Sequence, residues 1–139
     1  MKNTYYWLSV LVALLFSINL NAAQVVVVNP SNNTTVNKNE ISRIFLGKLK
    51  AFPGGGSVVP VNQKSGSAGK VEFDQKVVGK SASQIKAYWS KLMFSGKGKP
   101  PKELNNDNAI KSFIANEPNA IGYIDEANID SSVKVILKL

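Results

Sequence analysis

The sequence predicts an α/β domain in which a mixed sheet is flanked by helices. Short apolar runs that suit strands alternate with stretches whose apolar residues recur at helical spacing, and this alternation is typical of layered α/β domains. The chain has 139 residues, enough for one domain of ordinary size with one hydrophobic core. It contains no cysteine, so no disulfide contributes and the fold has to rest on that core.

Residues 1–23 have the pattern of a secretory signal peptide. Lys2 supplies a charged start, an apolar run extends from Tyr5 to Leu20, and two small residues end the segment. A membrane-spanning helix needs about 20 predominantly apolar residues, and this run is shorter and includes polar ones. We therefore expect cleavage on export, leaving residues 24–139 as a single domain that is not embedded in the membrane.

The charge balance suits an anionic partner. Lys and Arg number 17 against 9 Asp and Glu, a net charge of +8 that cleavage of a signal containing Lys2 would reduce to +7. A small anion, polyphosphate, nucleic acid or an acidic membrane surface would fit this balance. No nucleic-acid-binding module is recognisable, and the clearest lysine cluster, at Lys97, Lys99 and Lys102, suits a solvated surface. We expect no nucleic-acid partner.

Catalytic and metal-binding signals are weak. The absence of cysteine and histidine removes thiolate and imidazole ligands and every mechanism with a histidine base. A Ser-x-x-Lys spacing at Ser67–Lys70 recurs at Ser83–Lys86 without the other motifs of penicillin-recognising enzymes, and residues 79–81 resemble a P-loop end whose first glycine is replaced by Asp74. The acidic residues are mostly expected at helix ends or on the surface. We predict a protein that is not an enzyme, with no catalytic residue, metal or cofactor.

The first part of the exported chain predicts a strand, a helix and a loop. The run from Gln24 to Val28 is almost wholly apolar, as expected of a strand buried on both faces. Asn37 and Glu40 form a helix cap, and the apolar residues that follow share one face: Ile41, Ile44 and Phe45. Gly47 ends this short helix. A proline and three successive glycines then predict a mobile loop, outside the core, at Lys48–Ser57.

The stretch from Val58 to Phe73 predicts a strand, a polar loop of small residues and a helix start. The first N–H groups of a helix lack intrahelical acceptors and carry positive potential, so an anion suits this place. Glycines allow close backbone approach, serine hydroxyls can donate hydrogen bonds, and lysines add charge. The candidate ligand-binding residues are Gln63, Lys64, Ser65, Gly66, Ser67, Ala68, Gly69 and Lys70. The alternative is that Ser67 only caps the helix and no ligand binds.

The helix that begins in this stretch should be followed by a second, longer helix. Its valines at positions 71, 77 and 78 can face the core before a C-cap at Gly79. Ser81 and Gln84 then cap the best-defined helix of the chain. Its apolar residues have helical spacing and are expected to face the core: Ile85, Tyr88, Trp89, Leu92 and Met93.

The last part of the chain predicts one more helix and two closing strands. Glycines and prolines break the chain at residues 95–101, and a helix begins at Asn106 or Asp107. Apolar runs at Ala120–Ile124 and Val133–Leu139 then suit two strands that complete the mixed sheet.

Four short motifs occur in a characteristic order along the chain. They are Ile44-Phe45-Leu46-Gly47-Lys48, Val59-Pro60-Val61, Gly66-Ser67-Ala68-Gly69-Lys70-Val71-Glu72-Phe73 and Ala120-Ile121-Gly122-Tyr123. Together they resemble the phosphate-binding proteins of phosphate ABC transporters, which are type II periplasmic binding proteins. In that family two α/β lobes close over phosphate, and this chain is about as long as one lobe. The resemblance therefore implies an abbreviated, single-lobe member.

The anion-holding motif of the family, Arg-x-x-Gly-Ser-Gly-Thr-Arg-x-x-Phe, is matched only in part. Gly66, Ser67 and Phe73 agree with the motif, whereas Gln63 stands at the first arginine and Lys70 at the second. Ala68 and Gly69 replace the second glycine and the threonine. Because a bidentate arginine is the stronger partner for phosphate, and one lobe leaves a ligand exposed to water and salt, the departures predict weak phosphate binding or none.

Two hypotheses follow for the function. In the first, the exported domain binds phosphate or a similar small oxyanion, with residues 63–70 as the cradle. In the second, it keeps the lobe fold without binding phosphate and contacts an envelope transporter or sensor through the basic loop Gly96–Lys102 and the glycine loop Gly54–Gly56. Half a cleft leaves its ligand face exposed, so a homodimer that rebuilds a two-lobed cleft is plausible.

Overall fold

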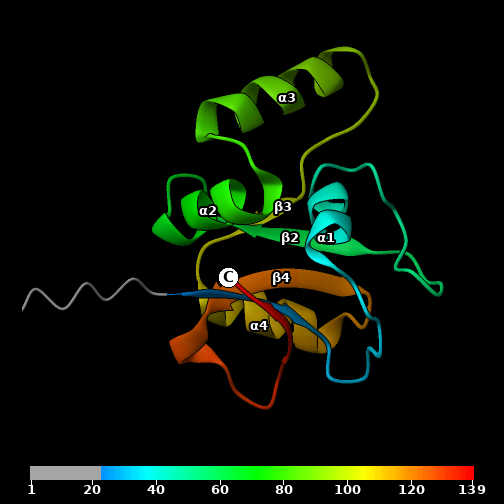
Figure 1. Cartoon of the computed structure of the whole chain (residues 1–139), viewed down its shortest axis with the longest axis vertical. Helices are drawn as coiled ribbons and strands as arrows, with labels where there is room; N and C mark the ends of the chain where they lie inside the picture. The colour runs from blue at the N-terminus through cyan, green and yellow to red at the C-terminus, as the bar shows by residue number, and fades with distance from the viewer. Residues whose placement is uncertain (1–22) are drawn as a thin grey trace, which may run out of the picture.

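A five-stranded mixed sheet forms the centre of the computed structural model, which describes residues 23–139 (Figure 1). The strands are β1 (Gln24–Val28), β2 (Val59–Gln63), β3 (Lys102–Leu104), β4 (Ala120–Asp125) and β5 (Lys134–Lys138), in the spatial order β3-β2-β4-β1-β5. β2 pairs in parallel with β3 and β4, whereas β1 pairs antiparallel with β4 and β5. The predicted α/β architecture with a mixed sheet is confirmed.

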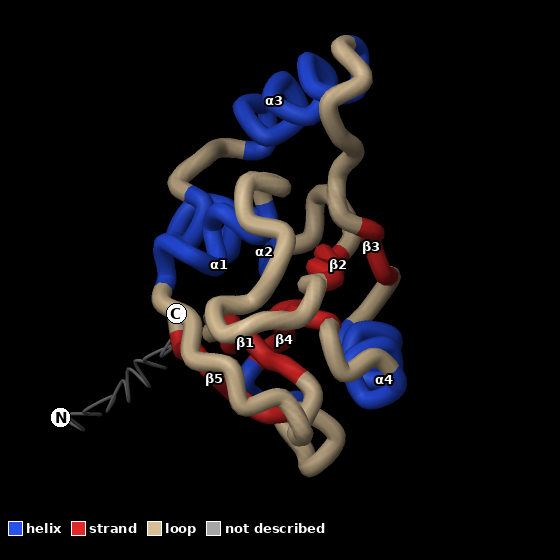
Figure 2. The backbone as a smooth tube through the Cα atoms, turned by 90° about the vertical axis from the view of Figure 1, so that its right-hand side faces the viewer, coloured by secondary structure: helices blue, strands red, loops and turns tan. Residues whose placement is uncertain are grey.

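The helices lie on both faces of this sheet. They are α1 (Lys38–Phe45), α2 (Ala68–Phe73), α3 (Ala82–Phe94) and α4 (Asp107–Asn116), with a π-helical turn η1 (Asp74–Val78) continuing α2 and a short 3-10 turn η2 (Glu126–Asn128). Figure 2 shows α1 and α2 on one side of the strands and α4 on the other. The sheet is therefore the middle layer of the domain, and only α3 stands apart from it.

β1 contributes to a hydrophobic cluster on each side of the sheet. All five of its residues are buried, as the apolar run predicts. Val26 and Val28 pack in a cluster with α1 and with Phe73 and Val77 of the α2 segment. Val25 and Val27 pack in a second cluster with Ile110 and Ile114 of α4. Both faces of β1 are thus removed from water, which is the main stabilising contribution available to a chain without disulfides.

Close packing between α4 and the sheet depends on Gly122 in β4. A Cβ at this position would lie 3.0 Å from Val61 and 3.1 Å from each of Ile110 and Ile114. On the other face, β4 presents Tyr123, whose ring stacks on Phe73 at 3.9 Å between centroids, while Phe45 meets Phe73 edge-on at 4.7 Å. The motif around Gly122 is therefore explained by packing on both faces of β4.

The predicted helix caps are confirmed. Asn37, Ser67, Ser81 and Asn106 each accept a hydrogen bond from the N–H group three residues later, at the start of α1, α2, α3 and α4. At the end of η1, Gly79 has a φ of 74°, in the left-handed region that favours glycine. Local side-chain chemistry therefore sets these boundaries.

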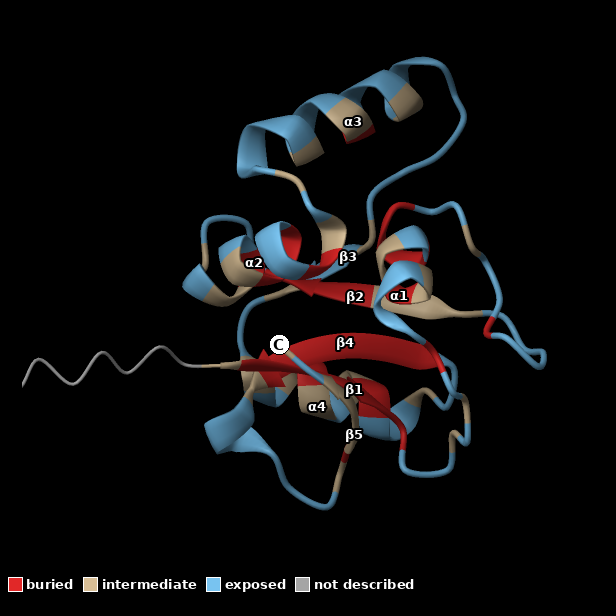
Figure 3. Cartoon of the chain, viewed as in Figure 1, coloured by how far each residue is buried: buried red, intermediate tan, exposed pale blue. Residues whose placement is uncertain are grey.

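The prediction that the apolar stripe of α3 faces the core is wrong. Trp89 is its only buried residue, and Met93 is 52% exposed. Figures 1 and 3 show α3 set off from the sheet and largely exposed along its length. The spacing of the stripe correctly predicts a helix, but helical spacing alone does not identify the surface that the apolar face covers.

Two smaller predictions are also corrected, and one strand is not predicted from the sequence. Val71 is 38% exposed rather than turned into the core. Phe52, in the loop predicted to lie outside the core, is 5% exposed and packs in the cluster beside α1, because backbone hydrogen bonds to Gly55 and Gly56 fold the loop back on itself. Strand β3 is not among the predicted elements, and its three residues are too few to show a period.

The predicted signal peptide lies outside the described residues, apart from position 23. Within residues 23–139, no helix is long and apolar enough to cross a membrane.

Candidate functional site

A pocket of about 540 Å³ lies between α3 and the loop that leads from β2 into α2. α3 contributes an apolar wall that includes Ile85, Trp89 and Met93. The opposite wall is polar and contains the loop residues Ser65 and Gly66 together with buried or charged side chains: Asn62, Lys70, Asp74 and Glu103. The volume falls in the range of ordinary small-ligand sites, which combine apolar walls with a few placed polar groups.

The structure brings some of the predicted site residues to this pocket and leaves others elsewhere. Ser65, Gly66 and Lys70 line it. Gln63, Ser67, Ala68 and Gly69 do not line it, and Lys64 is exposed beside it. The predicted cradle is therefore divided between the pocket and the packing of the helix start against the sheet.

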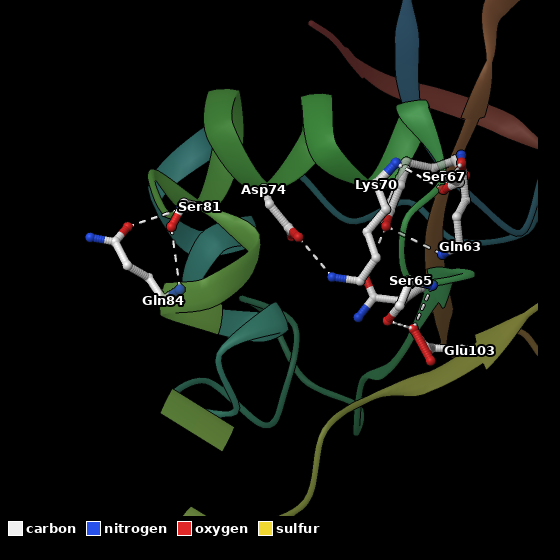
Figure 4. A network of polar contacts seen from close by, with 10 residues as sticks. Gln63, Ser65, Ser67, Lys70, Asp74, Ser81, Gln84 and Glu103 are labelled. Carbon is white, nitrogen blue, oxygen red and sulfur yellow. Dashed lines mark hydrogen bonds and ion pairs between the residues drawn. The ribbon is translucent and has the colours of Figure 1, made fainter. Parts of the chain in front are cut away.

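The Ser65 donors already hold a carboxylate oxygen. The backbone N–H of Ser65 donates to Oε1 of Glu103 at 2.8 Å, and the Ser65 hydroxyl donates to the same oxygen (Figure 4). Glu103 comes from β3, which pairs with β2 and thereby brings its side chain beside the loop. The loop thus binds an oxyanion supplied by the protein itself. Both Ser65 and Glu103 are exposed, so a solute can compete for these donors.

Ser67 acts within the protein as a helix cap. Its Oγ accepts a hydrogen bond from the backbone N–H of Lys70 at 3.2 Å and donates to Oε1 of Gln63 at 3.3 Å. This arrangement satisfies one of the N–H groups that a helix start leaves without an intrahelical partner. In the state described, the Ser67 hydroxyl is committed to the helix and to Gln63.

Gln63 is fixed by hydrogen bonds inside the fold. It is 8% exposed, and its Nε2 donates to Oε1 of Gln24 at 2.7 Å and to the carbonyl oxygen of Tyr123 at 3.1 Å. Gly69 packs against it so closely that an added Cβ would lie 2.2 Å from Oε1 of Gln63. Gln63 therefore joins β1, β2, β4 and the start of α2, and Gly69 provides the space it needs.

Lys70 and Asp74 form a buried ion pair at the edge of the pocket. Their Nζ and Oδ2 atoms are 2.7 Å apart, and the two side chains are 9% and 6% exposed. Burial raises the pKa of Asp74, and the hydrogen bond and charge of Lys70 oppose that rise. Burial also raises the pKa of the nearby Tyr123 phenol, whose hydroxyl donates to Asn62 at 3.0 Å. The ammonium group of Lys70 is thus largely neutralised by Asp74.

The acidic side chains that line the pocket are engaged within the protein. Among residues 23–139, no group of three or more acidic residues is placed to hold a metal ion. The two carboxylates at the pocket are both engaged, Asp74 by Lys70 and Glu103 by Ser65. What the pocket offers a ligand is a set of hydrogen-bond donors on one side and an apolar helix face on the other.

A second hollow, of about 400 Å³, lies beside the glycine loop and contains Phe52, Gly54 and Asn119. None of its lining residues carries a charge. It offers no electrostatic attraction to an anion and is a weaker candidate than the pocket under α3.

Three features of the pocket are not predicted from the sequence. Asp74 is four residues after Lys70 and could have been identified as its helical partner from that spacing. Glu103 lies 38 residues from Ser65, and no local pattern links them. The apolar wall exists because α3 stands apart from the sheet, whereas its apolar spacing predicts that it packs against the core.

Comparisons with known proteins identify the fold. No protein-family model and no curated protein matches the chain. Solved structures do match. An ABC-type phosphate transport receptor from Vibrio cholerae has a TM-score of 0.63 and 18% identity over 82% of this chain and 45% of its own. A putative phosphate ABC transporter substrate-binding protein with bound phosphate, from Clostridium perfringens, has a TM-score of 0.61 and 22% identity over 82% and 44%.

A third structure, PstS from Borrelia burgdorferi, has a TM-score of 0.60 and 12% identity over 82% of this chain and 46% of its own. The first two matches are described as a transport receptor and a substrate-binding protein rather than as enzymes. This chain spans less than half the length of each of the three structures. It therefore has the fold of one lobe of a phosphate ABC transporter substrate-binding protein, as the four sequence motifs predict.

Proposed function

We propose that this chain is an exported periplasmic binding domain for phosphate or a similar small oxyanion, and that the pocket beside Ser65 is its site. The observation that carries the proposal is the carboxylate of Glu103 held by the Ser65 N–H and hydroxyl groups. The two Ser65 donors are therefore placed so that both can donate to one oxygen of an oxyanion. The lobe fold shared with phosphate transport receptors and the net charge of +8 support the same ligand class.

In this proposal the ligand displaces Glu103. A phosphate oxygen takes the place of Oε1 at Ser65. Gly66, with a φ of 87° and no Cβ, leaves its backbone open to close approach by the ligand. Lys64 supplies positive charge from its exposed position, because Lys70 is paired with Asp74. Competition with Glu103 and the single-lobe setting both make the expected affinity low. Gln63, Ser67, Ala68 and Gly69 contribute by shaping the helix start rather than by contacting the ligand.

Isothermal titration with phosphate and then sulfate in low-salt buffer tests the proposal. We expect weak, saturable binding that becomes about tenfold tighter in Glu103→Ala, since a charge-assisted hydrogen bond contributes about 1.5–3 kcal/mol and its internal acceptor is gone. Glu126→Ala is the matched control, because it removes the same charge from an exposed position outside the pocket. Ser67→Asp should weaken binding by like-charge repulsion, because it adds a negative charge two residues from Ser65 without removing a ligand contact. Flat titrations of both the folded parent and Glu103→Ala would contradict the proposal.

A second candidate function is contact with an envelope transporter or sensor without phosphate binding. The pairing of Lys70 with Asp74 favours it, because that pairing removes one of the cations expected at the cradle. Capture of a partner from envelope extract, lost when Lys97, Lys99 and Lys102 are replaced by Glu, would support this alternative. Unaltered capture would count against that surface.

A further inference from the structure

The positive charge of this protein is concentrated in one projecting part of the molecule. Between Gln75 and Lys102 there are seven lysines and no acidic residue. The rest of the sequence holds the remaining ten basic residues against all nine acidic ones, which nearly cancel. The segment includes α3 and the loops on either side, which Figures 1 and 2 show at one end of the molecule. Five of the seven lysines lie in α3 or its flanking loops, whereas Lys76 lies in η1 paired with Glu72 and Lys102 begins β3. That end of the molecule therefore carries five positive charges and no negative one.

Exposed apolar side chains occur at the same end. Phe94, the last residue of α3, is 96% exposed, and Met93 beside it is 52% exposed. The chain then folds back on the helix, with the N–H of Lys97 donating to the carbonyl of Leu92 at 2.9 Å. Lys91, Lys97 and Lys99 are exposed around this turn. We name the group of Lys91, Met93, Phe94, Lys97 and Lys99 the α3 tip.

We propose that the α3 tip docks this protein onto the anionic phospholipid surface of a membrane. Lysines near such a surface are attracted to its headgroups, while aromatic and other apolar side chains enter the boundary between headgroups and acyl chains. The tip has both kinds of side chain and no carboxylate to repel the lipid phosphates. A lipid bilayer can be bound by lysines and exposed apolar side chains alone. An acidic protein partner would instead require a surface of complementary shape. Met93 also borders the pocket described above, but docking requires no ligand there, so the inference does not depend on phosphate binding.

Docking would use the side of α3 that the fold leaves uncovered. Trp89 and Tyr88 attach the helix to the body, since the Tyr88 hydroxyl donates to the carbonyl of Leu46 at 2.6 Å and the Trp89 ring covers Gly47. Phe94 lies five residues beyond Trp89 and makes no comparable attachment. Its near-complete exposure costs free energy in water, and transfer of its ring to a membrane interface would recover it.

Co-sedimentation with vesicles tests the proposal, using the protein from Ala23 onward, which contains every described strand and helix. Vesicles of equal parts phosphatidylglycerol and phosphatidylcholine should bind the protein at low salt, whereas pure phosphatidylcholine vesicles should not. Replacing Lys97 and Lys99 together with Gln should weaken binding about 25-fold, at about fivefold for each lysine. The matched control replaces Lys38 and Lys138 with Gln. These lysines are also exposed but belong to α1 and β5, and their replacement should change binding little.

Two aromatic substitutions separate membrane entry from simple charge attraction. Phe94→Ser should reduce binding to the anionic vesicles, and because the ring is exposed the variant should remain folded. Phe94→Trp should retain binding, and its emission should shift to shorter wavelength when vesicles are added, beyond any change shown by the parent protein.

Absence of binding to anionic vesicles would overturn the proposal, as would equal losses in the Lys97/Lys99 and Lys38/Lys138 variants. Retention on an immobilised acidic polypeptide without vesicle binding would also overturn it, in favour of an acidic protein partner.

Discussion

The body of the molecule and the arm formed by residues 79–101 differ in how they are held together. In the body, both faces of the sheet are covered by buried clusters, and polar groups such as Gln63 are tied by several hydrogen bonds. The arm contains α3, which buries only Trp89. It also contains five lysines and no acidic residue. Packing therefore accounts for the sequence of the body, whereas the apolar and basic residues of the arm suit contacts outside the fold.

The candidate pocket lies where these two parts meet. Its polar wall belongs to the body and is fixed by the Lys70–Asp74 pair and the cap at Ser67. Its apolar wall belongs to α3, which is attached chiefly at Tyr88 and Trp89. Elements with few buried contacts open at lower free energy than the core. The width of the pocket should therefore vary with the position of α3, while the polar wall stays in place.

The largest expected contrast between the two parts concerns the cost of removing an apolar side chain. Phe73→Ala should lower the free energy of unfolding by about 3–5 kcal/mol, because the ring is fully buried and stacks on Tyr123. Met93→Ala, in α3, should change it by less than about 0.5 kcal/mol. Urea denaturation of the two variants measures both values. Similar losses would show that α3 is part of the same cooperative core.

Breaking the buried ion pair should have the next largest effect. Lys70→Met leaves the carboxylate of Asp74 buried without its partner and should cost about 3 kcal/mol. The double variant Lys70→Met with Asp74→Leu should recover most of the loss, because two apolar side chains can replace a buried pair. Denaturation of the single and double variants measures the coupling. A single variant as stable as the parent would mean that water reaches the pair freely.

A smaller effect is expected where α3 is attached to the body. Tyr88→Phe removes the hydrogen bond to the Leu46 carbonyl and should lower stability by about 1 kcal/mol. The loss should appear mainly as faster hydrogen exchange at the α3 amides, with β1 amides unchanged. Equal acceleration in both elements would contradict the separation of arm and body.

The smallest effect concerns an exposed ion pair within the body. Lys111 of α4 donates to Asp130 at 2.7 Å, and this bond together with those from Ser132 lowers the pKa of Asp130 from 3.8 to about 2. A lowered acid pKa stabilises the fold above pH 3.8, and the benefit is lost as the pH falls through about 2. Asp130→Asn should therefore be slightly less stable than the parent near neutral pH. Denaturation midpoints of the two proteins should converge below about pH 2; a constant difference would exclude this cause.

Local patterns predict the body well because its signals are short in range. The caps at Asn37 and Ser67 follow from one residue and its partner three positions later. The run at Gln24–Val28 predicts a strand buried on both faces because no polar residue interrupts its four valines.

The sequence is less informative where a contact joins distant segments. The spacing of the α3 stripe predicts a helix but not that Met93 faces a pocket instead of the core. Glu103 reaches Ser65 only because β3 pairs with β2, and β3 is too short to be recognised in advance. The sequence motifs predict one cradle at residues 63–70, whereas in the structure some of these residues line the pocket and others pack inside the fold.

The central claim is that the donors around Ser65 bind an oxyanion, and amide chemical shifts recorded during a phosphate titration test it most directly. We predict saturable shifts at Ser65 and Gly66, with a matching change at Glu103 as its carboxylate is displaced. The β1 amides should not move. Shifts confined to the lysine-rich loop after α3, or no saturable shift at Ser65 in a protein that remains folded, would contradict the claim.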